Sequence, residues 1–373
     1  MSVRTPGQRS RYTALAVVAV ACLVLLSYAL STASTLTAPL LAVADAVSRL
    51  TSEAGGLFVR AGPELWLQPA AVYPSAALMR IGFSEALALR LPAALAGVLT
   101  IVVTFMLTTR ITGDRATAAA AAALLLVMPG FRAYAARPGA ELLMVPLVMA
   151  WVTACVAYRT RPRLWLIISG GVALGACAYT QPAGVLAVPV FFVVGAFLLW
   201  RGPRPMAALG SAAIATAATQ IPAVLWVGEH LQAYADTFGR WAIHAAHVRD
   251  PIDGVIAFTR WHVMGRRVGD YWQYFNPTFL FSTELFGVLF ALLLPIGLWG
   301  LRSASRGGAA LLIACALLIP IPAVLLDVQR SAGFVLLLLP IGAVISAVGL
   351  LRLRELTHPG NDVQIMNATS PPQ

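Results

Sequence analysis

Long apolar segments recur along this chain, and polar segments rich in arginine separate them. The hydrocarbon core of a bilayer is about 30 Å thick, and a helix of about 20 apolar residues crosses it. The chain has 373 residues, of which 59% are hydrophobic, and its mean hydropathy is +0.81. A soluble domain has too little interior to bury so much apolar surface. The sequence therefore predicts an all-α, polytopic membrane protein.

The apolar segments predict about ten transmembrane helices. They lie at residues 12–31, 85–109, 116–128, 142–158, 164–179, 184–200, 206–227, 281–301, 309–326 and 334–351. A cleaved signal peptide is the alternative interpretation of the first segment, because basic residues precede it and small residues follow it. Its length favours an uncleaved first span.

Arginine supplies every basic residue of the chain, and the net charge is +11. Arginines gather after alternate spans, for example at residues 159–163 and 352–354. Because positive residues concentrate in cytoplasmic loops, we interpret this charge as a topology signal and not as a nucleic-acid-binding surface. The prediction is a plasma-membrane protein with both termini cytoplasmic. Its parts are an N-terminus (1–11), a transmembrane domain (12–353) and a polar tail (354–373).

This topology places three larger loops outside, at residues 32–68, 129–141 and 228–280. Helical spacing of leucine and valine over residues 36–50 predicts a helix lying in the membrane interface. Residues 69–81 are apolar but too few to span the bilayer. The loop at 129–141 carries Arg132, Arg137 and Glu141 in a chain that is only 11% charged.

The sequence predicts no metal site and no cofactor. Each cysteine lies inside an apolar segment without paired spacing, which indicates neither a disulfide nor a metal centre: Cys22, Cys155, Cys177 and Cys315. His244 and His247 are three residues apart, whereas helical metal pairs more often use a spacing of four with an acid nearby.

Four stretches of the chain resemble one known family. Residues 67–100 contain a Pro-x-x-x-Tyr segment, a glycine turn and the run RLPAALAG. Residues 135–143 (AARPGAELL) are similar to an Arg-x-x-x-Asp/Glu motif, and residues 170–191 and 270–281 follow in the family's order. Over about residues 12–353 the chain resembles the GT-C fold membrane glycosyltransferases. The most similar group is family 39, which contains relatives of protein O-mannosyltransferases and aminoarabinose transferases.

The resemblance implies an enzyme that takes a sugar from a polyprenyl-phosphate donor. It passes the sugar to an acceptor glycan, lipid or protein on the outer face of the membrane. The reaction inverts the anomeric centre and uses no nucleotide sugar directly. The expected partners are therefore the lipid-linked donor, the acceptor and membrane lipid, with no nucleic acid.

Asp45 is the predicted catalytic base. It matches the first acid of an Asp-Glu pair that the family carries in its first outer loop, and Ala46 stands in the place of the second acid. Glycosyl transfer needs a base near the acceptor hydroxyl and stabilisation of charge on the leaving phosphate. One carboxylate is enough for an inverting displacement. Glu53 is a competing candidate, and a solvated face of the interfacial helix is the alternative interpretation of Asp45.

Four further residues are predicted to bind the donor. A guanidinium binds phosphate through two hydrogen bonds, so Arg137 is the predicted phosphate ligand, with lipid headgroup contact as the alternative. Arg330 is a second predicted contact. Glu141 is expected to orient Arg137, although a carboxylate in the first helical turn after Pro138 is also favoured by the helix dipole. Tyr73 is predicted to line the sugar pocket or to be an interfacial aromatic.

Two other functions stay open at this stage. The missing second acid also fits a catalytically degenerate relative that acts as a membrane scaffold or lipid-binding partner. A transporter or flippase would need charges within its spans, but nearly all charges here lie at the ends of the predicted spans. No internal repeat is visible in the sequence either.

Overall fold

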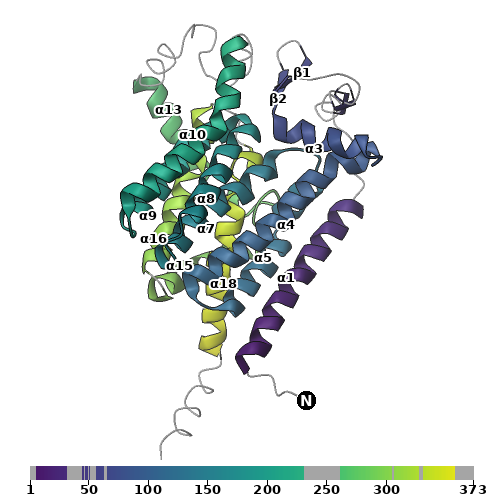
Figure 1. Cartoon of the computed structure of the whole chain (residues 1–373). Coiled ribbons are helices and arrows are strands. Elements are labelled where there is room, and N and C mark those ends of the chain that lie inside the picture. Colours follow the sequence, from purple (N-terminus) through teal and green to yellow (C-terminus); the bar gives the residue numbers. More distant parts are fainter. Residues whose placement is uncertain are drawn as a thin grey trace, which may run out of the picture.

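The computed structural model describes residues 6–31, 44–45, 47–48, 50, 56–62, 65–230, 261–304, 306–326 and 331–357. These residues form a helical bundle and a short two-stranded sheet (Figure 1). Up to residue 200 the elements, in which η denotes a 3₁₀ helix, are α1 (Pro6–Ser31), β1 (Val59–Gly62), β2 (Leu65–Leu67), α3 (Pro69–Arg80), α4 (Glu85–Thr112), α5 (Arg115–Val127), α6 (Pro129–Ala136), η1 (Glu141–Leu143), α7 (Met144–Thr160), α8 (Leu164–Ala176), η2 (Cys177–Tyr179) and α9 (Pro182–Trp200). Beyond residue 200 they are α10 (Pro205–Glu229), α13 (Trp261–Gln273), α14 (Pro277–Leu280), α15 (Phe290–Ala304), α16 (Arg306–Leu318), α17 (Pro320–Leu325), η4 (Ala332–Phe334) and α18 (Leu338–Thr357).

Within the described residues, six helical segments are long and apolar enough to cross a membrane: α1, α4, η1 with α7, α9, α10, and α16 with α17. The bent pair of α5 and α6 adds a seventh if it is one span. Two shorter apolar helices, Leu164–Tyr179 and Phe290–Leu301, accompany them. The chain is a multi-pass membrane protein, as the sequence predicts. The predicted number of about ten spans stays a prediction.

The two ends of the bundle carry different elements. In Figure 1, α1 begins and α18 ends at the lower end, whereas α3 and the sheet lie at the upper end. At the lower end a guanidinium nitrogen of Arg110, near the end of α4, donates to the hydroxyl of Thr160 at the end of α7 (3.4 Å). Both helices therefore run downward, and the residues that precede them, including Glu141, belong to the upper part of the bundle.

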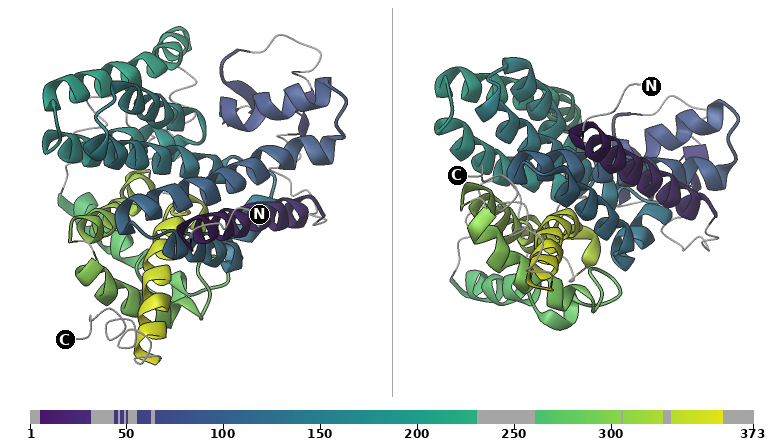
Figure 2. Two further views of the ribbon diagram at one scale, coloured as in Figure 1. Left: turned by 60° about the horizontal axis from the view of Figure 1, so that its bottom comes forward. Right: turned by 90° about the horizontal axis from the view of Figure 1, so that it is seen from below.

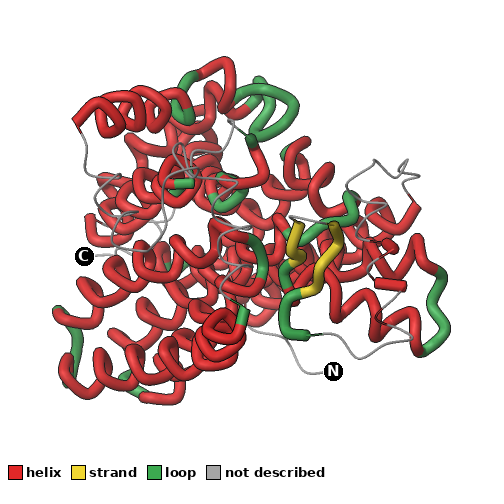
Figure 3. The backbone as a smooth tube through the Cα atoms, turned by 90° about the horizontal axis from the view of Figure 1, so that it is seen from above, coloured by secondary structure: helices red, strands yellow, loops and turns green. Residues whose placement is uncertain are grey.

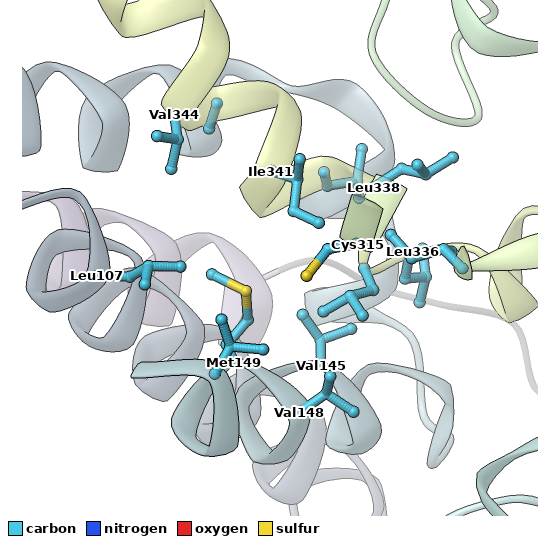
Figure 4. Packing of buried hydrophobic residues seen from close by; sticks show 14 of the residues in the cluster. Leu107, Val145, Val148, Met149, Cys315, Leu336, Leu338, Ile341 and Val344 are labelled. Carbon is cyan, nitrogen blue, oxygen red and sulfur yellow. The ribbon is translucent and has the colours of Figure 1, made fainter. Parts of the chain in front are cut away.

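The main core lies where α4, α7, α16 and α18 meet. Leu107, Met149, Cys315 and Ile341 come from these four helices, are at most 2% exposed and lie together in Figure 4. From residue 338 to 349, α18 is buried around its whole circumference. An apolar helix without a polar face needs such an environment. Figure 2 shows α18 inside the bundle and α1 at its edge.

Residues 129–141, predicted as an outer loop, contain α6 and the start of η1. Pro129 begins α6, and Met128 before it is extended (φ −62°, ψ 122°), as the residue preceding a proline tends to be. The axes of α5 and α6 therefore differ by 67°. The predicted place of Pro138 in the first turn of the next helix was wrong, because the helical structure there starts with η1 at Glu141.

Glycine allows α6 to lie directly on a distant part of the backbone. The amide of Gly130 donates to the carbonyl of Leu285 (3.1 Å). A Cβ added at Gly130 would lie 2.2 Å from the carbonyl oxygen of Glu284, which is far inside van der Waals contact. The segment that contains Glu284 is thereby held against α6.

Proline and glycine also move the boundaries of the last predicted spans. The segment predicted at 281–301 becomes a regular long helix only at Phe290, because turns around Gly287 (φ 78°) precede it. The segment predicted at 309–326 is divided into α16 and α17 before Pro320. The last span, predicted from residue 334, begins at Leu338.

Local signals also form the connection between α4 and α5 at the lower end. Gly113 adopts a left-handed conformation (φ 73°) and its amide donates to the carbonyl of Thr109. Asp114 then caps α5, because its carboxylate accepts from the amides of Ala116 (3.1 Å) and Thr117 (2.7 Å). Burial alone would raise the pKa of Asp114, but hydrogen bonds from Thr117, Ala116 and Arg115 outweigh it and lower the pKa.

A second, smaller core joins part of the first predicted outer loop to α3. Residues 44–45, 47–48 and 50 are helical. Ala44, Val47 and Leu50 are buried against α3 and Leu89 of α4, and the same spacing leaves Asp45 exposed. The predicted helix over 36–50 is thus present at these positions, and its residues 36–43 lie outside the described residues.

Candidate functional site

A cluster of polar and charged side chains surrounds Tyr134 of α6. We name it the Tyr134 cluster and define it as Tyr134, Arg137, Glu141, Glu284 and Ser331. The Ser331 side chain lies near the Tyr134 hydroxyl, and the charged groups of Arg137, Glu141 and Glu284 are close enough to act on it. Three parts of the chain that are far apart in sequence, near residues 134–141, 284 and 331, therefore meet at one place.

Arg137 is exposed and ends α6. Its guanidinium carbon lies 5.0 Å from the centroid of the Tyr134 ring, within the range of a cation–π contact. The residue has extended backbone angles (φ −84°, ψ 132°), and its amide donates to the carbonyl of Ala133 (3.1 Å). The charged group is thus supported by an aromatic face and remains accessible, which suits an anion that arrives from outside the bundle.

Glu141 is half-buried in the first turn of η1. A Cβ added at Gly139 would lie 2.2 Å from the carboxylate oxygen Oε2, so the carboxylate folds back over the Gly139 backbone. A Cβ added at Gly333 would lie 3.4 Å from Glu141 Cγ and 3.5 Å from the Tyr134 hydroxyl. Two glycines therefore make the space in which this carboxylate reaches the cluster.

The predicted pairing of Arg137 with Glu141 takes a different form. Between these two described residues the structure forms no ion pair; each instead acts on Tyr134, which lies beside both. Arg330 lies outside the described residues. Its neighbour Ser331 is in the cluster, where its hydroxyl also accepts from the amide of Gly333 (3.3 Å).

The other predicted residues lie on the unit formed by residues 44–50, the sheet and α3. Asp45 is exposed on the helical segment, and Glu53 lies outside the described residues. Tyr73 of α3 is 37% exposed, and its hydroxyl donates to the carbonyl of Gly56. Among the described residues, no hydrogen bond or ring contact joins Tyr73 to the Tyr134 cluster, so Tyr73 supports the loop that leads into β1.

Gln181, which belongs to the third stretch of the family resemblance, connects two parts of the upper end. Its side chain is buried, and its Nε2 lies 3.6 Å from the sulfur of Met144, a weak acceptor. Met144 begins α7 directly after η1. The turn between η2 and α9 is therefore fixed next to the segment that carries Glu141.

Three cluster members were not predicted from the sequence: Tyr134, Glu284 and Ser331. Glu284 carried a usable signal, since a carboxylate within an apolar segment is costly and is often functional. The predicted span at 281–301 contains this acid, and the structure places it in the turn before α15. Tyr134 lies between two arginines of α6, but its neighbours Ser331 and Gly333 are about 200 residues away in sequence.

The described residues contain no group of three His, Cys, Asp or Glu side chains placed to hold a metal ion. His244 and His247 lie outside them. The Tyr179 hydroxyl donates to the carbonyl of Thr219 in α10. The Tyr271 hydroxyl donates to the carbonyl of Leu317 in α16, and burial raises the pKa of Tyr271.

Part of this chain is similar to a known family model. Residues 68–226 match the model described as dolichyl-phosphate-mannose-protein mannosyltransferase. This match covers α3 through most of α10, including Tyr134, Arg137 and Glu141. Over these residues the chain is similar to that mannosyltransferase family. None of the curated protein sequences matches it significantly.

Solved GT-C structures share this fold. ArnT from Cupriavidus metallidurans bound to undecaprenyl phosphate aligns with a TM-score of 0.62 and 17% identity, over 91% of this chain and 60% of its own. The archaeal oligosaccharyltransferase AglB from Archaeoglobus fulgidus, in complex with an inhibitory peptide and a dolichol-phosphate, aligns with a TM-score of 0.55 and 16% identity. That alignment covers 97% of this chain and 52% of AglB. The chain thus spans a little over half the length of these GT-C proteins.

Proposed function

We propose that this protein is an integral membrane glycosyltransferase that moves a sugar from a polyprenyl-phosphate donor to an acceptor on the outer face of the membrane. The match to a mannosyltransferase family model and the likeness to GT-C structures holding undecaprenyl phosphate or dolichol-phosphate support the donor class. The observation that carries the proposal is the Tyr134 cluster, where an accessible guanidinium, a phenol and carboxylates meet. Tyr134, Arg137 and Glu141 of this cluster lie within the matched region.

Arg137 is the proposed ligand of the donor phosphate. A guanidinium presents a planar pair of donors that matches two phosphate oxygens, and it remains charged at any physiological pH. The Tyr134 ring below the guanidinium limits its motion, and the Tyr134 hydroxyl adds a neutral donor. Arg330, one residue before Ser331, is the proposed second cation. As the bond to the sugar breaks, these groups stabilise the negative charge that gathers on the phosphate.

Asp45 is the proposed base, with Glu53 as the alternative. In a direct displacement the carboxylate takes the proton of the acceptor hydroxyl while the hydroxyl oxygen bonds to the anomeric carbon. The bond between that carbon and the phosphate oxygen breaks at the same time, and its electron pair leaves with the phosphate. One step of this kind inverts the anomeric centre and needs no second carboxylate as a nucleophile.

The proposed topology has about ten spans in the plasma membrane, with the upper end of Figure 1 outside. The common position of the start of α1 and the end of α18 supports termini on one side. Exposed arginines at the lower end, including Arg159, Arg161 and Arg163, support a cytoplasmic location for that side. Asp45 and the residues near it then lie at the outer membrane interface, where an acceptor is available.

Transfer from a radiolabelled polyprenyl-phosphate sugar by purified protein in lipid nanodiscs tests this function. Asp45→Asn should lower the rate by about 10²-fold or more, because it removes the proposed general base. Arg137→Ala should lower it by about 10²-fold or more, because it removes charge stabilisation at the phosphate. Arg161→Ala is the matched control, since this exposed arginine lies at the opposite end and should leave the rate unchanged.

The result also separates the main rival. A degenerate relative acting as a scaffold or lipid-binding partner would bind the polyprenyl phosphate but release no sugar, in the original protein as well as in the variants. Full activity of both Asp45→Asn and Arg137→Ala would refute the site assignment while leaving the glycosyltransferase activity in place.

A further inference from the structure

Five ring side chains gather at the upper end of the bundle, outside the Tyr134 cluster. We name them the aromatic cluster: Phe58, Trp66, Tyr179, Trp226 and His230. The Trp226 ring lies 4.8 Å from Phe58, 5.2 Å from Trp66 and 4.4 Å from His230, measured between centroids, and Phe58 lies 6.5 Å from Tyr179. The rings come from the sheet region, η2 and the end of α10, and their contacts bring these elements to one place. Figure 3 shows the two strands of this region in yellow, seen from above.

The hairpin of β1 and β2 has two different faces. Val59 pairs with Leu67, and Arg60 pairs with Trp66. Residues opposite each other in an antiparallel pair lie on the same face, and neighbours along a strand lie on opposite faces. Val59 and Leu67 accordingly pack on the small core with α3, whereas Trp66 contacts Trp226 and the Arg60 guanidinium carbon lies 5.8 Å from the Trp66 ring. The hairpin thus presents its aromatic and basic face towards α10.

The aromatic cluster borders the proposed catalytic region from two directions. Tyr179 comes two residues before Gln181, whose side chain contacts Met144 directly after η1 and Glu141. On the other side, the Tyr73 hydroxyl donates to the carbonyl of Gly56, and a Cβ added at Gly56 would lie 3.1 Å from Trp226 Nε1. The cluster therefore lies between the unit that carries Asp45 and the helices that carry the Tyr134 cluster.

These rings are not sealed as core residues are. Phe58, Trp66, Tyr179 and Trp226 are partly exposed, and Arg60 and His230 are exposed. The His230 ring is held parallel to Trp226, within 5°, and its Nδ1 lies 2.9 Å from the Trp226 carbonyl oxygen. Partly exposed tryptophan and tyrosine rings offer an apolar surface with polar groups at its border. A pyranose ring has the complementary form, with C–H groups on its faces and hydroxyls around its edge.

We propose that the aromatic cluster, with Arg60 at its border, binds a pyranose ring. The C–H face of the sugar lies on the partly exposed rings, and its hydroxyls bond to Arg60 and His230. The choice of a sugar as the ligand rests on the proposed function. Because the aromatic cluster lies next to the unit that carries Asp45, we assign the bound pyranose to the acceptor. The donor also carries a sugar, which is the second possible source of the same ring.

Binding of free sugars tests this without any transfer. Protein in nanodiscs is titrated with the methyl glycosides of mannose, glucose, galactose and N-acetylglucosamine, and saturation-transfer difference NMR reports contact with the ring protons. At least one glycoside should bind the original protein. Trp226→Ala and Trp66→Ala should each weaken its binding by about tenfold, because each removes an aromatic contact. Trp200→Ala is the control, since this 64% exposed tryptophan ends α9 away from the cluster.

The aromatic cluster can also be a purely structural clasp between the hairpin and α10. In that case the two variants lower the unfolding temperature but leave glycoside binding unchanged, which would overturn the proposal, as would the absence of binding by all four glycosides. Trp226→Phe keeps an aromatic ring and should bind the glycoside more tightly than Trp226→Ala. If Trp226→Ala does not fold, Trp226→Phe is compared with Trp66→Ala instead and should bind the glycoside more tightly than that variant.

Transfer assays then distinguish the two sources of the sugar. If the acceptor occupies the cluster, Trp226→Ala raises the KM for the acceptor and leaves hydrolysis of the donor by water unchanged. If the donor sugar occupies it, the same variant slows both reactions. If the protein transfers no sugar at all, the proposed function fails, whereas the glycoside titration still decides whether the cluster binds a pyranose.

Discussion

Gly130 determines how closely α6 approaches the segment that contains Glu284. Because an added Cβ would lie 2.2 Å from the carbonyl oxygen of Glu284, Gly130→Ala must displace backbone on one side. Overpacking of this kind costs about 1–3 kcal/mol. We expect a lower unfolding temperature in detergent and a weaker glycosyl transfer, since the Tyr134 cluster needs both segments in place.

Gly210→Ala is the matched control for that change. Nothing lies within 4 Å of a Cβ at Gly210, which is exposed within α10. Alanine is the better helix former by up to about 1 kcal/mol, so this variant should be equally or more stable. Equal destabilisation by both substitutions would show that the close approach at Gly130 has no particular importance.

At the residue scale the sequence predicts which chemical groups form the site better than it predicts which residues contact one another. Arg137 and Glu141 were selected from a family motif and from their rarity in an apolar chain, and both lie in the Tyr134 cluster. Their common neighbour Tyr134 was not predicted, because its role depends on Ser331 and Glu284, which are distant in sequence. Asp45 is exposed as an amphipathic helix requires, and its catalytic role stays a prediction.

At the scale of single elements, the cap of α5 gives a clear expectation. Asp114 accepts hydrogen bonds from two amides and from the Thr117 hydroxyl (2.6 Å). Asp114→Ala should cost about 1 kcal/mol of stability, the usual value for a lost N-cap. Asp114→Asn keeps a side-chain acceptor and should lose less; a loss as large as that of alanine would argue against the cap.

The same residue gives a dependence on pH with a defined sign. The pKa of Asp114 is lower in the folded protein than the usual aspartate value. Folding therefore favours the ionised form of Asp114. Its contribution to the stability of the folded protein is complete above the unfolded pKa and disappears as pH falls through the folded pKa. The difference between the unfolding temperatures at pH 7 and at pH 3 should be smaller for Asp114→Asn than for the original protein. An identical difference would show that the carboxylate is not responsible.

Elements with a long apolar pattern were predicted well, and short ones were not. The spans over α1, α4, α9 and α10 follow directly from runs that match the thickness of a bilayer. The strands have only four and three residues, and α6 has eight, so none of them produces a pattern that distinguishes it from a loop. Helix ends moved wherever Pro129, Pro320 or Gly287 interrupted an apolar run.

For the whole molecule, the proposed orientation leads to a labelling experiment. Ser84 before α4 and Pro162 after α7 are both exposed and lie at opposite ends of the bundle. In intact cells a membrane-impermeant maleimide should label Ser84→Cys at once and Pro162→Cys only after permeabilisation. The native cysteines give little background, since three of the four are buried. The reverse pattern would place the Tyr134 cluster on the cytoplasmic side.

The general architecture was predictable because the bilayer limits a polytopic chain to few solutions. A helical membrane fold and its GT-C relatives were both expected, and the family match and the structural likeness confirm them. The arrangement of the upper end was not predictable, because the aromatic cluster joins residues 58 and 226 through contacts that leave no periodic signal. Such long-range contacts between loops appear only when the helices have been placed.

The alternation along β1 and β2 has a consequence for insertions and deletions. Adding or removing one residue in either strand would exchange the two sides of the ribbon, since side chains alternate with a period of two. Trp66 would then turn towards α3 and Leu67 towards Trp226. The first loop should therefore tolerate changes in length around the strands much better than within them, and a single-codon deletion inside β2 should separate α10 from the part of the chain that bears Asp45.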